Sequence, residues 1–110
     1  MPVEVSSDGV GRHSPEVEAA VYFCCLEALQ NVAKYAAATR AWITLTEDAG
    51  ALRFEVRDDG AGFDPLVTSF GTGLQGMTDR LDAIGGAVRV DSVPGRGTTV
   101  TGTIPLAIRA

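Results

Sequence analysis

The sequence predicts an α+β fold, a two-layer α/β sandwich in which helices cover one face of a mixed, mostly antiparallel sheet. The order of the expected elements supports this: a long helix, two strands, a second helix and two further strands. Apolar residues make up 45% of the chain and occur in short runs between turn residues, as in globular proteins. A length of 110 residues suits one hydrophobic core, so residues 1–110 are expected to form a single domain.

The first helix is predicted from Pro15 to about Ala37. Ser14 precedes it as an N-cap, and a proline fits the first helical position because its missing N–H is not needed there. Acidic residues in the first turn lie near the positive end of the helix dipole. A second helix is predicted over Leu74–Ile84, because Gly85-Gly86 is a typical helix end.

Five segments have the β-branched and aromatic character or the alternation of strands. The turns Asp48-Ala49-Gly50 and Pro94-Gly95-Arg96-Gly97 join two pairs of them. The residues from Asp8 to Gly11 are expected to form a loop. The predicted strands are Pro2–Ser6, Arg40–Glu47, Leu52–Asp58, Ala87–Ser92 and Thr98–Leu106.

Composition and charge exclude several classes of function. A net charge of −5 argues against non-specific nucleic-acid binding and against direct contact with acidic membranes, but it allows a nucleotide ligand. No run approaches the roughly 20 apolar residues of a membrane span, so a cytoplasmic location is expected. Cys24 and Cys25 are adjacent and are expected to pack in the helix rather than to form a disulfide. His13 is the only histidine and is expected to be a structural loop residue.

A polar strip on the first helix is a candidate metal and phosphate site. Glu27, Asn31 and Lys34 are spaced by four and three residues, so they stack on one side of the helix, with Tyr35 at its edge. An amide oxygen suits Mg²⁺, a carboxylate can orient a metal-bound water, and an amine can meet a phosphate. On its own, such a strip is more often the solvated side of a helix.

Two glycine-rich segments complete the candidate site. Asp58-Asp59-Gly60-Ala61-Gly62 follows a strand, where a buried carboxylate could accept a hydrogen bond from an exocyclic amine; an Asx turn is the alternative. Gly71-Thr72-Gly73-Leu74 leads into the second helix, whose amides favour anions; a loop without a ligand is the alternative. It is neither a Walker A loop nor a dinucleotide fingerprint.

In this order the three motifs resemble the ATPase superfamily of gyrase, heat-shock chaperones, histidine kinases and mismatch-repair proteins. The resemblance covers about Ser14 to Leu106, including the closing turn at Pro94-Gly95-Arg96-Gly97, which is similar to the end of this domain in histidine kinases. It implies the Bergerat ATP-binding fold and Mg²⁺ and ATP as ligands. The short segment between Asp64 and Gly71, followed by Gly-Leu-Gln-Gly-Met-Thr-Asp-Arg-Leu, is similar to the sensor kinases that include nitrate and membrane-fluidity sensors.

The resemblance also implies a role for each matching residue. Asn31 would coordinate Mg²⁺, and Glu27, whose role is less settled in kinases, would orient a metal-bound water. Asp58 would accept from the adenine amine, with Thr98 supporting the adenine pocket. Arg80 is expected to have a structural or interface role. The remaining predicted nucleotide-binding residues are Lys34, Tyr35, Gly60, Gly62, Gly71, Thr72, Gly73 and Leu74.

The expected activity is transfer of the γ-phosphate of ATP to a histidine on a separate dimerisation and phosphoacceptor domain, in two-component signalling. That domain belongs to the same kinase or to a partner, and a response regulator is reached only indirectly. The chain itself is expected to be monomeric, in the cytosol or as the cytosolic part of a membrane-anchored kinase, with a mobile lid at Pro65–Phe70. Two alternatives stay open: an anti-sigma-factor serine kinase of the same superfamily, and a non-catalytic nucleotide-binding docking module.

Overall fold

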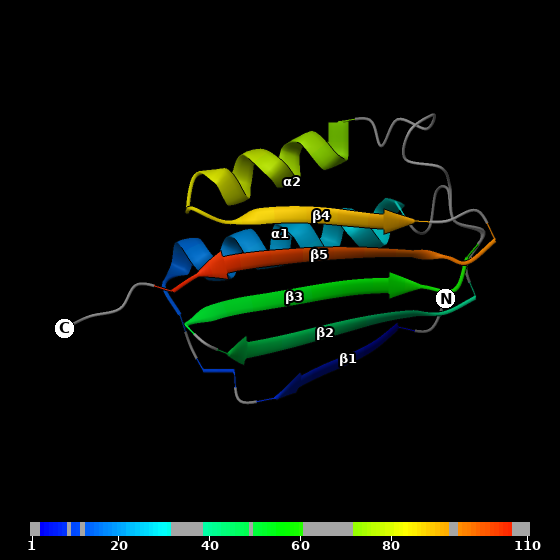
Figure 1. Cartoon of the computed structure of the whole chain (residues 1–110), viewed down its shortest axis with the longest axis horizontal. Coiled ribbons are helices and arrows are strands. Elements are labelled where there is room, and N and C mark those ends of the chain that lie inside the picture. The colour runs from blue at the N-terminus through cyan, green and yellow to red at the C-terminus, as the bar shows by residue number, and fades with distance from the viewer. Residues whose placement is uncertain are drawn as a thin grey trace.

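One five-stranded sheet and two helices make up the described part of the chain (Figure 1). The computed structural model describes residues 3–8, 10–11, 13–31, 39–48, 50–60, 72–92 and 95–106, without the side chains of residues 8, 31, 48 and 72–75. The elements are β1 (Val3–Asp8), α1 (Pro15–Asn31), β2 (Ala41–Asp48), β3 (Ala51–Asp58), α2 (Thr72–Asp82), β4 (Ala87–Ser92) and β5 (Thr98–Pro105). Neither described helix is long and apolar enough to cross a membrane.

The strands follow the order β1-β2-β3-β5-β4, so β1 and β4 form the two edges. β1 runs parallel to β2, and the other neighbouring strands are antiparallel. Both helices lie on the same side of this sheet (Figure 1). The predicted α+β sandwich with a mixed, mostly antiparallel sheet is therefore confirmed.

One predicted boundary at the start of the chain, the end of the first strand, differs from that observed. The N-cap at Ser14 is confirmed, because its side-chain oxygen accepts from the amide of Val17 at 3.3 Å. α1 is described to Asn31, so the predicted continuation to Ala37 lies outside the described residues. The expected loop at Asp8 is wrong: β1 continues through Asp8, because this residue is still paired with β2.

The second helix is displaced by two residues at each end, beginning at Thr72 and ending at Asp82. Its last turn closes with the amide of Gly86 on the carbonyl of Leu81 at 2.7 Å and the amide of Gly85 on the carbonyl of Asp82 at 3.1 Å. These two bonds form a Schellman motif, in which Gly85 has a positive φ. The glycine pair therefore ends the helix as expected, but through a turn that begins at residue 83.

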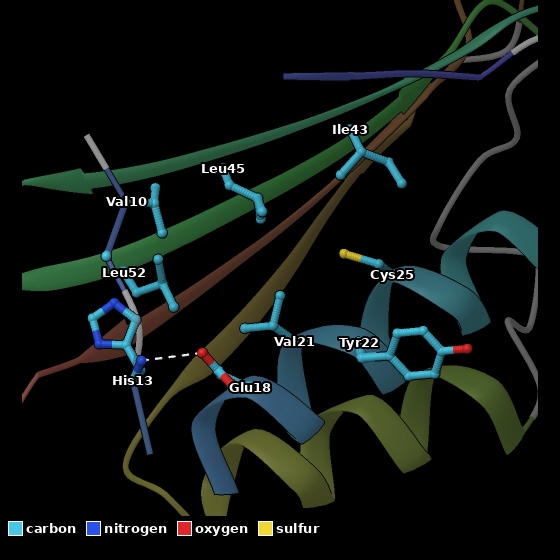
Figure 2. A pocket seen from close by; sticks show the side chains of 10 residues that line it. Val10, His13, Glu18, Val21, Tyr22, Cys25, Ile43, Leu45 and Leu52 are labelled. Carbon is cyan, nitrogen blue, oxygen red and sulfur yellow. Dashed lines mark hydrogen bonds between the residues drawn. The ribbon is translucent and has the colours of Figure 1, made fainter. Parts of the chain in front are cut away.

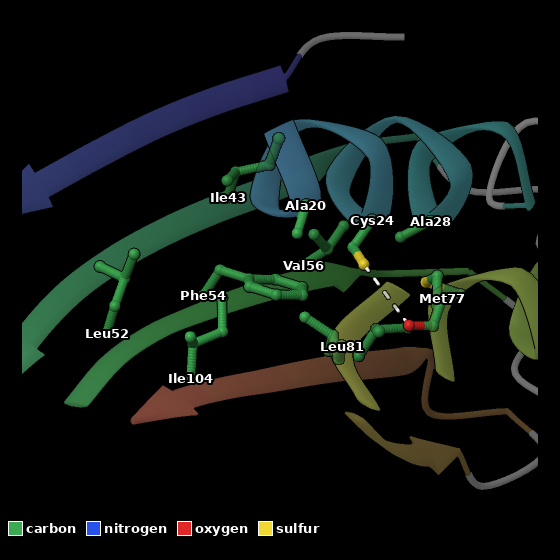
Figure 3. Packing of buried hydrophobic residues seen from close by; sticks show 11 residues of the cluster. Ala20, Cys24, Ala28, Ile43, Leu52, Phe54, Val56, Met77, Leu81 and Ile104 are labelled. Carbon is green, nitrogen blue, oxygen red and sulfur yellow. Dashed lines mark hydrogen bonds between the residues drawn. The ribbon is translucent and has the colours of Figure 1, made fainter. Parts of the chain in front are cut away.

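The core lies between the helices and the side of the sheet that faces them (Figure 3). Ala20, Cys24 and Ala28 are spaced by four residues, so α1 presents them together to the sheet. Cys24 is fully buried and Cys25 half-buried, and both are free thiols, as expected. The buried cluster consists of Ala20, Cys24, Ala28, Ile43, Leu52, Phe54, Val56, Met77, Leu81, Val100 and Ile104.

A contact between the side chains of Arg80 and Phe23 connects α2 with α1. The guanidinium of Arg80 lies 4.4 Å from the centre of the Phe23 ring, a cation–π arrangement. Gly76 faces the same ring, and a Cβ atom at this position would lie 3.4 Å from it. These contacts agree with the structural role expected for Arg80.

Candidate functional site

Asp58 and Thr98 are the two buried polar side chains of the described residues, with 4% and 7% of their surfaces exposed. They are partners in the register of β3 and β5, so they lie side by side where β3 ends and β5 begins. Oδ1 of Asp58 accepts from the amide of Gly60 at 2.8 Å. Burial raises the pKa of Asp58, the amides of Gly60 and Thr98 oppose this, and the charge of Asp59 raises it further. The buried carboxylate therefore favours an additional hydrogen-bond donor.

Gly97, in the turn between β4 and β5, lies against the backbone of Asp58. A Cβ atom on Gly97 would lie 2.2 Å from the carbonyl oxygen of Asp58, so only glycine allows the two backbones to approach this closely. The hydroxyl of Ser92 lies 2.8 Å from that of Thr98 and donates to the carbonyl of Gly97 at 3.3 Å. Ser92 was not predicted as a site residue, because nothing in the sequence indicates that it pairs with Thr98 on the neighbouring strand.

Asp59 has a different role from its neighbour. Its exposed carboxylate accepts from the amide of Thr39 at 2.9 Å, from the hydroxyl of Thr39 at 2.6 Å and from the amide of Arg40 at 3.0 Å. The amide of Asp59 in turn donates to the carbonyl of Arg40 at 3.3 Å. The Thr39 hydroxyl and then the Arg40 amide lower the pKa of Asp59. These hydrogen bonds of Asp59 connect the residues just before β2 to the end of β3, next to Asp58.

We expect Asp59→Asn and Thr39→Val to lower the urea midpoint of unfolding at pH 7. Because the pKa of Asp59 is lower in the folded state, its stabilisation is complete above the unfolded value of about 3.9 and is lost as the pH falls through the folded value. The difference between wild type and Asp59→Asn should therefore shrink below about pH 4. Thr44→Val, on an exposed position of β2, is the control for Thr39→Val. A pH-independent difference would contradict this account.

Ends of both helices and of β3 and β5 lie together at one end of the molecule (Figure 1). The C-terminus of α1, the N-terminus of α2, the end of β3 and the start of β5 all lie there, on the right of the view. The first turn of α2 contains no acidic residue, so its free amides present a positive dipole end to this site. Glu27 is half-buried in the last described turns of α1. Asn31 is the last residue of α1 that the structure describes.

Several predicted site residues lie outside the described part of the chain, and their positions remain predictions. These are Lys34, Tyr35, Gly62 and Gly71, together with the expected lid at Pro65–Phe70 and the side chains of Asn31, Thr72 and Leu74. The backbone of Thr72, Gly73 and Leu74 forms the first turn of α2. Among the described residues, no group of three His, Cys, Asp or Glu side chains could hold a metal ion.

Residues 16–108 match the family described as histidine kinase-, DNA gyrase B- and HSP90-like ATPase. The chain belongs to this ATPase family. Two curated relatives of this ATPase domain are sensor histidine kinases: YvfT of Bacillus subtilis strain 168, 39% identical over 97 residues, and the oxygen sensor NreB of Staphylococcus carnosus strain TM300, 38% identical over 99 residues. The matches cover 88% and 86% of this chain but only 25% and 28% of the relatives.

Solved histidine kinases have the same fold as this ATPase domain. The histidine kinase domain of the blue-light-activated kinase from Erythrobacter litoralis EL346 has a TM-score of 0.77 and 25% identity, over 96% of this chain and 51% of that one. The Acinetobacter baumannii kinase AdeS has a TM-score of 0.75 at 15% identity, over 97% of this chain and 54% of that one, which supports the fold alone. The resemblance predicted from the three motifs is confirmed.

Proposed function

We propose that this domain binds Mg·ATP beside Asp58 and transfers the γ-phosphate to a histidine on a separate dimerisation and phosphoacceptor domain. The observation that carries the proposal is the buried Asp58–Thr98 pair, beside which Gly60 and Gly97 leave the backbone without side chains. The adenine base would lie here, its exocyclic amine donating to Asp58. Because this carboxylate is buried, a hydrogen bond from the base is worth more than one at an exposed group.

The triphosphate would extend from this pair toward the N-terminus of α2. In this proposal the amides of residues 71–74 bind phosphate oxygens, and Lys34 and Tyr35 contribute further contacts. Mg²⁺ prefers phosphate and water oxygens with one or two protein ligands. Asn31 would supply the protein ligand and Glu27 would orient a metal-bound water. Mg²⁺ would neutralise phosphate charge during transfer.

Placement of the phosphate, rather than covalent catalysis by the domain, would account for most of the rate. The one histidine of the chain is poorly placed as an acceptor, since its Nε2 pairs with Oε1 of Glu47 at 2.9 Å. His13 also precedes the N-terminus of α1, whose 17 residues span about 25 Å to the candidate site. The acceptor would therefore come from another domain, and the sensor-kinase relatives favour histidine over serine as the acceptor residue.

Calorimetric titration with a non-hydrolysable ATP analogue tests this proposal. We expect Mg²⁺ to strengthen binding, and Asp58→Asn to weaken it by about tenfold to a hundredfold, because a hydrogen bond to a charged group contributes about 1.5–3 kcal/mol. Asp82→Asn, an exposed position at the far end of α2, is the matched control and should leave binding unchanged.

The outcomes separate the alternatives. Absence of binding in wild type would refute the nucleotide site, and binding that ignores Mg²⁺ would favour a docking module. For the transfer step, we expect an added phosphoacceptor domain of a sensor kinase to gain acid-labile, alkali-stable phosphate. Alkali-labile phosphate on a serine would instead indicate a serine kinase.

A further inference from the structure

An apolar groove runs between α1 and the β1–β2 edge of the sheet. The helices pack mainly on β3, β5 and β4; beside α1, the same face of β2 lines a cavity and the same face of β1 is exposed. Ile43 and Leu45 of β2 lie on this face. Val5 is the register partner of Ile43, and paired residues of neighbouring strands point to the same face. The apolar surface therefore continues from β2 onto the edge strand.

Exposed apolar side chains of the described residues border this groove on β1 and on α1. Four large ones are exposed, and none of them lies on α2 or on β3, β4 or β5: Val3 at 40%, Val5 at 66%, Tyr22 at 70% and Leu26 at 41%. Val3 and Val5 are two residues apart on one face of β1, and Tyr22 lines the cavity from α1. The groove therefore has an apolar wall on each side. Such clustering on a soluble domain is typical of an interaction surface.

A cavity of about 370 Å³ deepens the groove near the N-terminus of α1 (Figure 2). Val21, Tyr22 and Cys25 line it from the helix, and Ile43, Leu45 and Leu52 line it from the sheet. The sulfur of Cys25 points into this space, whereas the buried Cys24 belongs to the core (Figures 2 and 3). A cavity of this size accepts several aliphatic groups of a bound molecule.

The end of the groove beside the cavity is acidic. Oε2 of Glu18 accepts from the amide of His13 at 3.1 Å (Figure 2). Oε1 of Glu47 accepts from the amide of Gly11 at 3.3 Å and pairs with the His13 ring. Both carboxylates contribute to the net charge of −5 of the chain. An occupant with cationic side chains at this end would be attracted, and an acidic one would be repelled.

We propose that this groove docks an amphipathic helix of a partner protein, with aliphatic side chains toward the cavity and lysine or arginine beside Glu18 and Glu47. A helix is about 10 Å wide and would lie in the same layer as α1 and α2, packing on α1 at its side and on β1–β2 beneath it. A strand added to the free edge of β1 would leave Tyr22 and the cavity uncovered. A second copy of the chain would bring acidic surfaces together.

Two synthetic peptides test the proposal on the full chain. One is an amphipathic leucine–lysine helix, and the other has glutamate in place of every lysine. We expect the lysine peptide to bind at least tenfold more tightly, and Tyr22→Ser with Val5→Ser to weaken its binding at least tenfold. Ala87→Ser, an exposed position on the opposite edge strand, should have no effect. Both altered side chains are largely exposed, so the variant should remain folded, which circular dichroism would verify.

A second readout locates the bound peptide. It should shift the NMR signals of the Cys25 and Ile43 side chains, which line the cavity, without changing the affinity for the ATP analogue at the other end of α1. Three outcomes would overturn the proposal. These are equal binding of both peptides, binding that is unaffected by the groove variant, and self-association of the chain that the groove variant abolishes. None of them depends on whether the domain binds nucleotide.

Discussion

Gly102→Ala is expected to destabilise the domain by about 3 kcal/mol, at the upper end of the usual range for overpacking in a core. A Cβ atom on Gly102 would lie 2.0 Å from Cε2 and 2.1 Å from Cζ of Phe54. The Phe54 ring is fully buried in the middle of the cluster, so it cannot swing into solvent to relieve the contact. Urea unfolding, followed by the fluorescence of the one tryptophan, Trp42, measures the change.

A double-mutant cycle identifies the cause of this loss. Phe54→Leu should destabilise the wild type but recover at least about 1 kcal/mol when combined with Gly102→Ala, because a shorter side chain leaves room for the methyl group. Gly11→Ala is the matched control, since a Cβ atom there meets nothing within 4 Å. If Gly102→Ala alone changes stability by less than about 1 kcal/mol, the packing described here is incorrect.

Gly97→Ala should both destabilise the domain and weaken nucleotide binding. The positive φ of 81° at Gly97 disfavours alanine by about 1–2 kcal/mol. The added Cβ atom would also lie 2.2 Å from the carbonyl oxygen of Asp58, and a backbone atom cannot rotate away as a side chain can. We expect a total loss of about 3 kcal/mol in unfolding free energy. Displacement of Asp58 should also weaken binding of the ATP analogue at least tenfold.

Gly95→Ala separates the two contributions. Gly95 lies in the same turn with a φ of 82°, but a Cβ atom there meets nothing within 4 Å. This variant should therefore lose about 1 kcal/mol of stability and retain its affinity for the nucleotide. Equal effects of the two substitutions would show that backbone conformation alone, and not the approach to Asp58, explains the requirement for glycine.

The sequence by itself determined the features that depend on neighbouring residues. The N-cap at Ser14 and the glycine end of α2 follow from local hydrogen bonding, which a few adjacent residues specify. The alternation of apolar and polar residues from Leu52 to Arg57 likewise matches the alternating burial of β3. The order of the three motifs identified the family, because glycines and polar residues at fixed spacing reflect the demands of one ligand.

Only the tertiary structure decided which residues meet across the sheet. Two adjacent aspartates look alike in the sequence, yet β5 buries Asp58 beside Thr98, and Asp59 turns outward to bind Thr39 and Arg40. The extension of β1 to Asp8 depends on its pairing with β2, more than thirty residues later in the chain. The groove beside α1 exists because two helices pack mainly on β3, β5 and β4 and leave the edge strand β1 exposed. These features depend on strand order and layer packing, which join distant segments and leave little trace in local sequence patterns.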